Sequence, residues 1–167
     1  IKKVDKASNG KIGYIYIPDM GPEGLNEFSR YFYPQLDKEG LIIDDRANGG
    51  GNVSPMILER LSREPYRLTM RRGSARIGTV PDAVQVGPKV CLINKYSASD
   101  GDLFPWGFRA LGLGKLIGTR TWGGIVGISG SLPYMDGTDI RVPFFTSFDP
   151  KTGSWIIENH GVDPDIL

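Results

Sequence analysis

The 167-residue sequence lacks the features that mark several classes of protein. It has one cysteine, Cys91, so no disulfide can form within the chain, which favours a reducing compartment and a cytoplasmic location. No apolar run approaches the ~20 residues that a membrane-spanning helix needs, so we expect no membrane span. The formal net charge is only +1, which gives no general attraction to nucleic acid or to an anionic membrane. These absences favour an ordinary globular domain.

The two ends of the sequence carry no start or targeting signal. The chain opens IKKVDKASNG, without an initiator methionine or a signal-peptide pattern, and it stops at VDPDIL directly after a structured segment. We therefore expect a piece of a longer protein. Residues 1–10 are expected to be a lead-in or linker, and residues 11–167 a single core domain, because this length is close to that of one domain.

Strand and helix patterns alternate along much of the chain. Short apolar and β-branched runs predict strands over residues 11–17, 41–45 and 90–93. Helical spacing of apolar residues predicts helices over residues 24–35, from 54 onward and over 100–113. After residue 116 short strands and turns take over, at 132–134, 140–145 and 155–157. The order predicts an α/β fold with a mostly parallel sheet, helices packed on it and C-terminal β-hairpins.

Two unusual sequences stand directly after predicted strands, RANGGGN after one and NKYSASDGD after another. In parallel sheets chemistry gathers at the carboxyl ends of the strands. Ser99 lies in a strand–turn–helix corner, where a nucleophile and backbone N–H groups can be built together. From these residues alone a plainer interpretation stays open, in which Ser97 or Ser99 only caps the helix.

The triple glycine Gly49–Gly51 is the second candidate for chemistry. A phosphate-binding loop of the Walker type would need Lys-Ser or Lys-Thr after the last glycine, but Asn52-Val53 follows, so we set that function aside. What remains is a loop without Cβ atoms that can point N–H groups at a developing oxyanion. Two such loops at neighbouring strand ends would form a site for acyl transfer.

Four motifs together resemble a known family. They are DDRANGGGN (44–52), NKYSASDGD (94–102), GLGKLIGTRTWGG (112–124) and ENHGVDPD (158–165). In this order they resemble the peptidases of the tricorn and C-terminal-processing family, family S41, and its tricorn-like branch in particular. The resemblance implies a crotonase-like core of the ClpP/crotonase type. It also implies a serine peptidase that cleaves peptide bonds through an acyl-enzyme.

The resemblance also implies roles for individual residues. Ser99 matches the nucleophile, and Glu158 matches a glutamate that sits behind the general base. Gly51 matches the glycine whose N–H faces the oxyanion, and its neighbour Gly50 takes that role if the match shifts by one residue. Asp100, directly after the nucleophile, would donate the second oxyanion N–H through its backbone.

The general base distinguishes the two branches of the family. C-terminal-processing members pair the serine with a lysine further along the chain, but that position here is Gly124, and Lys115 comes too early. Tricorn-like members use a histidine, backed by a serine, from an upstream segment. The one histidine here, His160, falls in a turn where the family does not place the base. We therefore expect His160 to be structural and the base to lie outside this chain.

Other functions fit the sequence less well than a peptidase. Asp44, Asp45, Asp163 and Asp165 are not accompanied by cysteine or histidine ligands, so we expect no metal, and no cofactor is implied. The basic stretch favours a solvated face over a contact with a peptide carboxylate; it comprises Arg60, Arg63, Arg67, Arg71, Arg72 and Arg76. A non-catalytic ligand-binding module of the same fold, or an acyl-CoA enzyme, would not need Ser99 and Glu158 together with the glycine loop.

The expected partners follow from the peptidase hypothesis. They are a peptide or unfolded-protein substrate and upstream domains of the same polypeptide. A homo-oligomer is left open, and nucleic acid is not expected to bind.

Overall fold

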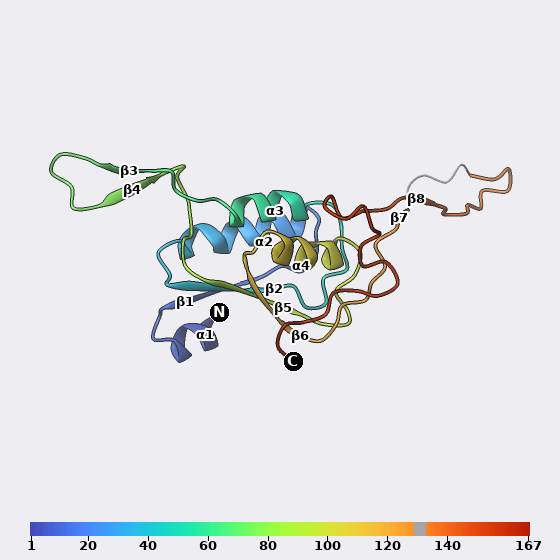
Figure 1. Ribbon diagram of the computed structural model, residues 1–167, viewed down its shortest axis with the longest axis horizontal. Coiled ribbons are helices and arrows are strands. Elements are labelled where there is room, and N and C mark those ends of the chain that lie inside the picture. The colour runs from blue at the N-terminus through green and yellow to red at the C-terminus, as the bar shows by residue number, and fades with distance from the viewer. Residues whose placement is uncertain (129–132) are drawn as a thin grey trace.

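The computed structural model describes residues 1–128 and 133–167, and its centre is a parallel sheet (Figure 1). The sheet has four strands in the order β1-β2-β5-β6. Their bounds are Ile12–Tyr16 for β1, Gly40–Asp44 for β2, Lys89–Ile93 for β5 and Gly114–Gly118 for β6. Every neighbouring pair is parallel, so the carboxyl ends of all four strands lie at the same edge.

Helices cover the sheet unequally. Three helices lie over one face (Figure 1), α2 (Pro22–Phe32), α3 (Ser54–Leu61) and α4 (Asp100–Ala110). Pro34 ends α2 in a 3₁₀ turn, Tyr33–Gln35. A short helix, α1 (Lys2–Ala7), packs against β1 on the other side of the sheet. Residues 1–10, expected to be a lead-in, thus contain a helix.

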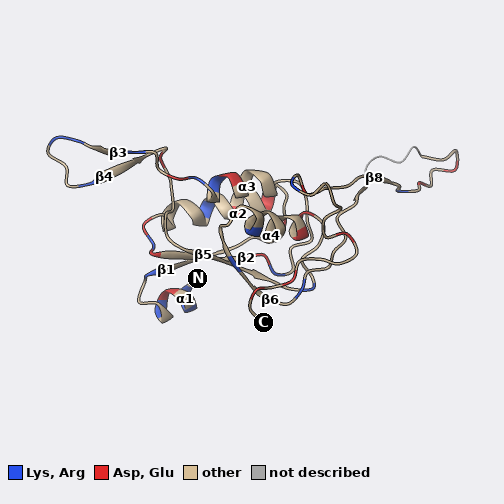
Figure 2. Ribbon diagram, viewed as in Figure 1, with Lys and Arg blue, Asp and Glu red and all other residues tan. Residues whose placement is uncertain are grey.

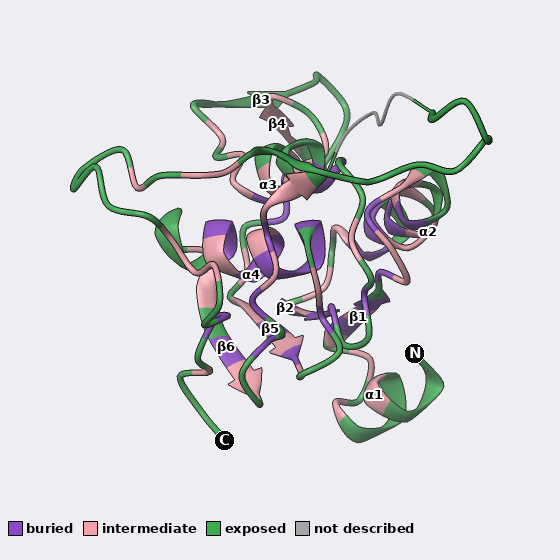
Figure 3. Ribbon diagram, turned by 90° about the vertical axis from the view of Figure 1, so that its right-hand side faces the viewer, coloured by how far each residue is buried: buried purple, intermediate pink, exposed green. Residues whose placement is uncertain are grey.

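The hydrophobic core lies between the sheet and the three covering helices. Alternate residues of β1, Gly13 and Ile15, are buried, and α2 and α4 each carry buried residues along part of their length (Figure 3). Fully buried members include Ile15, Ile43, Cys91, Ile93, Phe32, Ile57, Phe104, Phe108 and Leu116. This core fixes the positions of the loops that follow β2 and β5.

Two hairpins project from opposite ends of the molecule (Figure 1). The first pairs β3 (Arg67–Met70) with β4 (Ile77–Val80), and much of the predicted basic stretch lies on it (Figure 2). The second pairs β7 (Gly127–Ile128) with β8 (Pro143–Phe145). No helix in the described part of the chain is long and apolar enough to cross a bilayer.

Several predicted elements need correction. The first hairpin was not predicted as a pair of strands. The strand predicted over 140–145 is confined to Pro143–Phe145, and the one over 155–157 is reduced to a single bridge between Phe148 and Trp155. The strand predicted over 132–134 begins at Leu132, outside the described residues, and Pro133 and Tyr134 are not in a strand.

Candidate active site

The two loops singled out from the sequence meet at the carboxyl edge of the sheet, because β2 and β5 are neighbours. The Ala98 N–H donates to the carbonyl of Asn48 at 2.8 Å, and the Ala47 N–H donates to Oδ1 of Asn94 at 3.0 Å. The Ser97 hydroxyl donates to the carbonyl of Asp45 at 2.8 Å. The glycine loop and the serine corner are therefore held side by side.

Ser99 occupies a strained corner at the start of α4. Its φ is 58° and its ψ is −121°, a conformation that non-glycine residues rarely adopt and that recurs at functional sites. Its side chain is exposed and makes no capping hydrogen bond to the helix. Ser97, in contrast, is fully buried. Of the two serines, only Ser99 presents its hydroxyl to solvent.

The glycine loop lies directly against this corner. A Cβ atom on Gly50 would lie 2.7 Å from Cβ of Ser99 and 3.0 Å from the backbone nitrogen of Asp100. The Gly50 N–H already donates to Oδ1 of Asn48 at 3.0 Å. Within the described residues the N–H groups of Gly51 and Asp100 donate to no acceptor. These are the two donors that the sequence assigned to an oxyanion.

The carboxylate of Asp100 points to another task. It accepts hydrogen bonds from the N–H and the hydroxyl of Ser54, the first residue of α3. The side chain is buried, so this link joins the starts of α3 and α4. The part of Asp100 that can donate a hydrogen bond beside Ser99 is therefore its backbone N–H.

Glu158 reaches the loop that follows β6. Its Oε2 accepts from the N–H of Ile125 at 2.7 Å and from that of Val126 at 2.9 Å. Its Oε1 takes part in no hydrogen bond within the described residues. Among the described residues, one oxygen is thus fixed by the backbone and the other receives no donor.

Within the described residues, neither His160 nor position 124 presents a proton acceptor to the Ser99 hydroxyl. The Nε2 atom of His160 lies 2.9 Å from Oδ2 of Asp163. The other carboxylate oxygen of Asp163, Oδ1, pairs with Arg120. A Cβ on Gly124 would lie 2.2 Å from the ring of Trp122, so a lysine could enter this position only if the indole moved. The structure gives no partner for the Ser99 hydroxyl from either residue.

Asp102 is a residue that we did not single out from the sequence. It is fully buried three residues after Ser99, and its Oδ1 accepts from the Gly123 N–H at 2.8 Å. A signal was available, since Ser-x-x-Asp at the start of a helix is close to the capping-box pattern. That pattern would have placed this carboxylate at the nucleophile corner.

The carboxylates once considered for a metal site serve other purposes. Asp44 accepts from Tyr14 and Arg46, and Asp165 accepts from the Leu116 N–H at 2.8 Å. In the part of the chain that the structure describes, no group of three or more His, Cys, Asp or Glu is arranged to hold a metal ion.

Asp45 is an unusual acid beneath the two loops. It is fully buried, and neither side-chain oxygen meets the geometry of a hydrogen bond within the described residues. Burial raises the pKa of its carboxyl well above the ordinary value. Asn48 nearby lowers this pKa, while the charges of Asp102, Asp44 and Asp100 raise it further. Asp45 therefore favours the protonated form.

We expect Asp45→Asn to stabilise the fold at neutral pH. Because the folded-state pKa is raised, the cost of Asp45 begins as the pH passes the ordinary value of about 4 and grows with further rise in pH. An amide has no such ionisation cost. Keeping such a carboxyl neutral costs about 1.4 kcal/mol for each pH unit above its ordinary pKa, which corresponds to several degrees in Tm. The gain, measured by thermal unfolding, should be larger at pH 8 than at pH 5.

Asp44→Asn is the matched control for this experiment. Burial raises the pKa of Asp44, but hydrogen bonds from Arg46 and Tyr14 outweigh it and lower the pKa overall. Its stabilising contribution is present at neutral pH and is lost on acidification, so this variant should unfold at a lower temperature. A gain in Tm for Asp44→Asn, or a loss for Asp45→Asn, would contradict these assignments.

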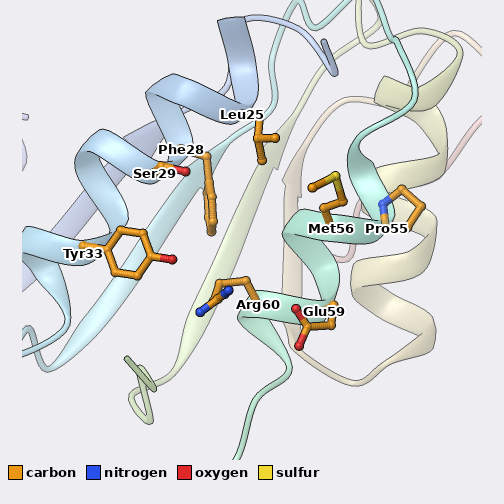
Figure 4. A pocket seen from close by; sticks show the side chains of 8 residues that line it. All are labelled: Leu25, Phe28, Ser29, Tyr33, Pro55, Met56, Glu59 and Arg60. Atoms are coloured by element: carbon orange, nitrogen blue, oxygen red, sulfur yellow. The ribbon is translucent and has the colours of Figure 1, made fainter. Parts of the chain in front are cut away.

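A separate concave surface lies between α2 and α3 (Figure 4). Its lining is mainly apolar and consists of Leu25, Phe28, Ser29, Tyr33, Pro55, Met56, Glu59 and Arg60. None of the candidate active-site residues lines it. This groove is therefore distinct from the Ser99 corner.

Comparisons with known proteins agree with the arrangement of these motifs. The sequence pattern of peptidase family S41 matches residues 11–167. The chain is 47% identical over 169 residues to the tricorn protease of Thermoplasma volcanium and 46% identical over 164 residues to that of Thermoplasma acidophilum. A crystal structure of the tricorn protease superimposes with a TM-score of 0.90 at 45% identity.

These matches cover nearly all of this chain but only a small part of each tricorn chain. They cover 99%, 98% and 99% of this chain but 16%, 15% and 16% of the respective tricorn chains. The α/β fold with C-terminal hairpins, expected from the sequence, is confirmed by the structure and by this superposition. On the evidence of its motifs, fold and relatives, the chain belongs to peptidase family S41.

Proposed function

We propose that this chain is the nucleophile-bearing part of a tricorn-like serine peptidase. The observation that carries the proposal is the exposed hydroxyl of Ser99 on a strained corner, beside the N–H groups of Gly51 and Asp100, which donate to no acceptor among the described residues. A loop without Cβ atoms and a helix start supply these N–H groups at one place. A module that only binds a ligand has no need of such a corner.

The chemistry follows from this arrangement. The Ser99 oxygen attacks the carbonyl carbon of the scissile peptide bond while its proton passes to a general base. The Gly51 and Asp100 N–H groups stabilise the oxyanion of the tetrahedral intermediate. The base then gives the proton to the leaving amine. The C–N bond of the intermediate breaks, the amine departs, and the acyl group remains on Ser99 as the acyl-enzyme. Attack by water on this ester releases the acid and restores Ser99.

The general base in this proposal is a histidine outside residues 1–167. Two observations support an external base. His160 is engaged with Asp163, and residue 124 is a glycine, which has no side chain that could act as a base. Oε1 of Glu158 is the acceptor available to orient the incoming imidazole, because Oε2 is already held by two N–H groups.

The proposal includes the nature of the substrate and the setting. Short or unfolded peptides are the expected substrates, since they can lie extended over an exposed corner. The remaining domains of a longer polypeptide, in cis or as a separate chain, would supply the base. The free, buried Cys91 supports a reducing, cytoplasmic location.

A fluorophosphonate probe tests the function. In the protein carrying its upstream segment, the probe should attach to Ser99, as mass spectrometry of the peptide containing residues 97–102 would show. A protein with Ser99→Ala should remain unlabelled. Absence of any adduct in the active preparation, or an adduct on Ser97, would refute the proposed role of Ser99.

Glu158→Gln is expected to slow turnover and to leave peptide binding nearly unchanged. The amide keeps the size of the side chain but cannot stabilise positive charge that develops on the base. We expect kcat to fall on the order of 10-fold or more with KM within about twofold, because orientation of the base matters in the transition state. An unchanged kcat would reduce Glu158 to a residue that only binds the backbone of Ile125 and Val126.

A further inference from the structure

The strained corner at Ser99 needs support from outside its own side chain. In an ordinary helix start the serine hydroxyl would cap the helix, but here it makes no such hydrogen bond. The backbone conformation at φ 58° costs free energy for a residue with a Cβ atom. Such a conformation persists only where surrounding contacts impose it, and the described structure shows which contacts do so.

Asp102 is placed to impose it. Its carboxylate lies one turn into α4, fully buried, and accepts from the Gly123 N–H at 2.8 Å. Burial raises the pKa of this carboxyl. The pKa is lowered in turn by the Thr121 hydroxyl and by the N–H groups of Gly123, Ser99 and Gly124. Of these donors only the Gly123 N–H meets the geometry of a hydrogen bond within the described residues, where Oδ2 has no partner, so this carboxylate joins the first turn of α4 to the loop after β6.

The loop that Asp102 contacts, residues 121–126, is held from a second side by Glu158. The N–H groups of Ile125 and Val126 donate to Glu158, while the Asn159 N–H donates to the carbonyl of Gly123 at 2.7 Å. A further tie runs from the Trp122 N–H to the carbonyl of Ser97 at 2.9 Å. The 121–126 loop is therefore held by two carboxylates, that of Asp102 and that of Glu158.

We propose that Asp102 is a positioning residue, which fixes the Ser99 corner relative to the 121–126 loop and, through that loop, relative to Glu158. The residue touches no substrate atom in this account. It holds the nucleophile Ser99 and the carboxylate of Glu158 in a fixed position relative to each other. The inference rests on the proposed peptidase function, but the linkage itself can be tested without activity.

Asp102→Asn is the variant that tests the linkage. The amide is nearly the same size, but it places an NH₂ donor among N–H donors and removes the charge that strengthens these hydrogen bonds. In the 167-residue chain, amides of the 121–126 loop should exchange with deuterium on the order of 10-fold faster. Amides of β1, β2 and β5 should exchange as in the unmodified chain.

Asp165→Asn is the matched control. The Asp165 carboxylate also accepts a backbone N–H, that of Leu116, and pairs with Arg109, but it does not contact the 121–126 loop. Its replacement should leave exchange in that loop unchanged. Asp102→Glu retains a carboxylate that can accept the Gly123 N–H, so the 121–126 loop should exchange more slowly in this variant than in Asp102→Asn. This variant also keeps the test decisive if Asp102→Asn does not fold.

Kinetics of the protein with its upstream segment give the second readout. Asp102→Asn should lower kcat about 10- to 100-fold with KM within about twofold, because misplacement of a nucleophile acts on the transition state. Asp165→Asn should keep the kcat of the unmodified protein. Unchanged exchange in the 121–126 loop, or faster exchange spread evenly over the sheet, would overturn the role of Asp102. Retained hydrolysis by Ser99→Ala would overturn the peptidase mechanism instead.

Discussion

Ser99→Ala is expected to abolish peptide hydrolysis by the protein that carries its upstream segment. The nucleophile is lost, so the rate should fall on the order of 10³-fold or more, to the background that the oxyanion donors alone provide. Folding should be unaffected, because the Ser99 hydroxyl is exposed and makes no capping hydrogen bond. We expect the change in unfolding free energy to stay within about 0.5 kcal/mol. Steady-state kinetics and thermal unfolding of the same preparation would measure both effects.

Ser97→Ala separates the role of the nucleophile from that of a structural hydroxyl. The Ser97 side chain is fully buried and donates to the carbonyl of Asp45 at 2.8 Å. Its removal should cost about 1 kcal/mol of stability and leave most of the activity. If Ser97→Ala silences the enzyme while Ser99→Ala does not, the nucleophile has been assigned to the wrong serine.

Gly50→Ala should sharply reduce activity, because Gly50 lies directly against the Ser99 corner. The new methyl group would lie 2.7 Å from Cβ of Ser99, 2.8 Å from the carbonyl oxygen of Ala98 and 3.0 Å from the nitrogen of Asp100. The backbone at position 50 also has φ of +99°, which strains any residue with a Cβ. We expect kcat to fall on the order of 10²-fold or more, as when an oxyanion donor is displaced.

The adjacent residue supplies the control for Gly50→Ala. A Cβ on Gly49 meets nothing within 4 Å, and Gly49 is not among the described glycines with positive φ. Gly49→Ala should therefore fold and retain most of its turnover. Equal activity of the two alanine variants would show that the close approach of Gly50 to Ser99 has no bearing on catalysis.

The parts of the fold that were predicted are those where burial shapes the sequence. The strands at 41–45 and 90–93 are short apolar runs because both become inner strands of the sheet, and their boundaries shifted by one residue at most. The β3–β4 hairpin was missed because all four residues of β3 are exposed. Without one buried face, a strand has no alternation that a sequence pattern could reveal.

The site divides in a similar way. The Ser99 corner and the glycine loop stood out because strand ends of a parallel sheet converge, which the order of the elements already implies. The link from Asp102 to Gly123 joins residues 21 positions apart, and the links from Glu158 to the loop span 32 and 33 positions. Such contacts depend on how loops cross after folding. No local pattern encodes them, and the capping-box spacing at Asp102 indicates only its helix.

The central claim is that Ser99 is the nucleophile of a site whose base comes from outside these 167 residues. It predicts that the chain folds, because the sheet and three helices enclose a complete core, yet does not turn over peptides alone.

Loss of the general base of a serine mechanism costs several orders of magnitude in rate. The most direct measurement is an assay of purified 1–167 against a mixed set of fluorogenic peptides, with and without the upstream segment added. The account predicts no turnover by the chain alone and Ser99-dependent turnover once the segment is present. Turnover by the chain alone that is lost in both Ser99→Ala and His160→Ala would contradict it and make His160 the base.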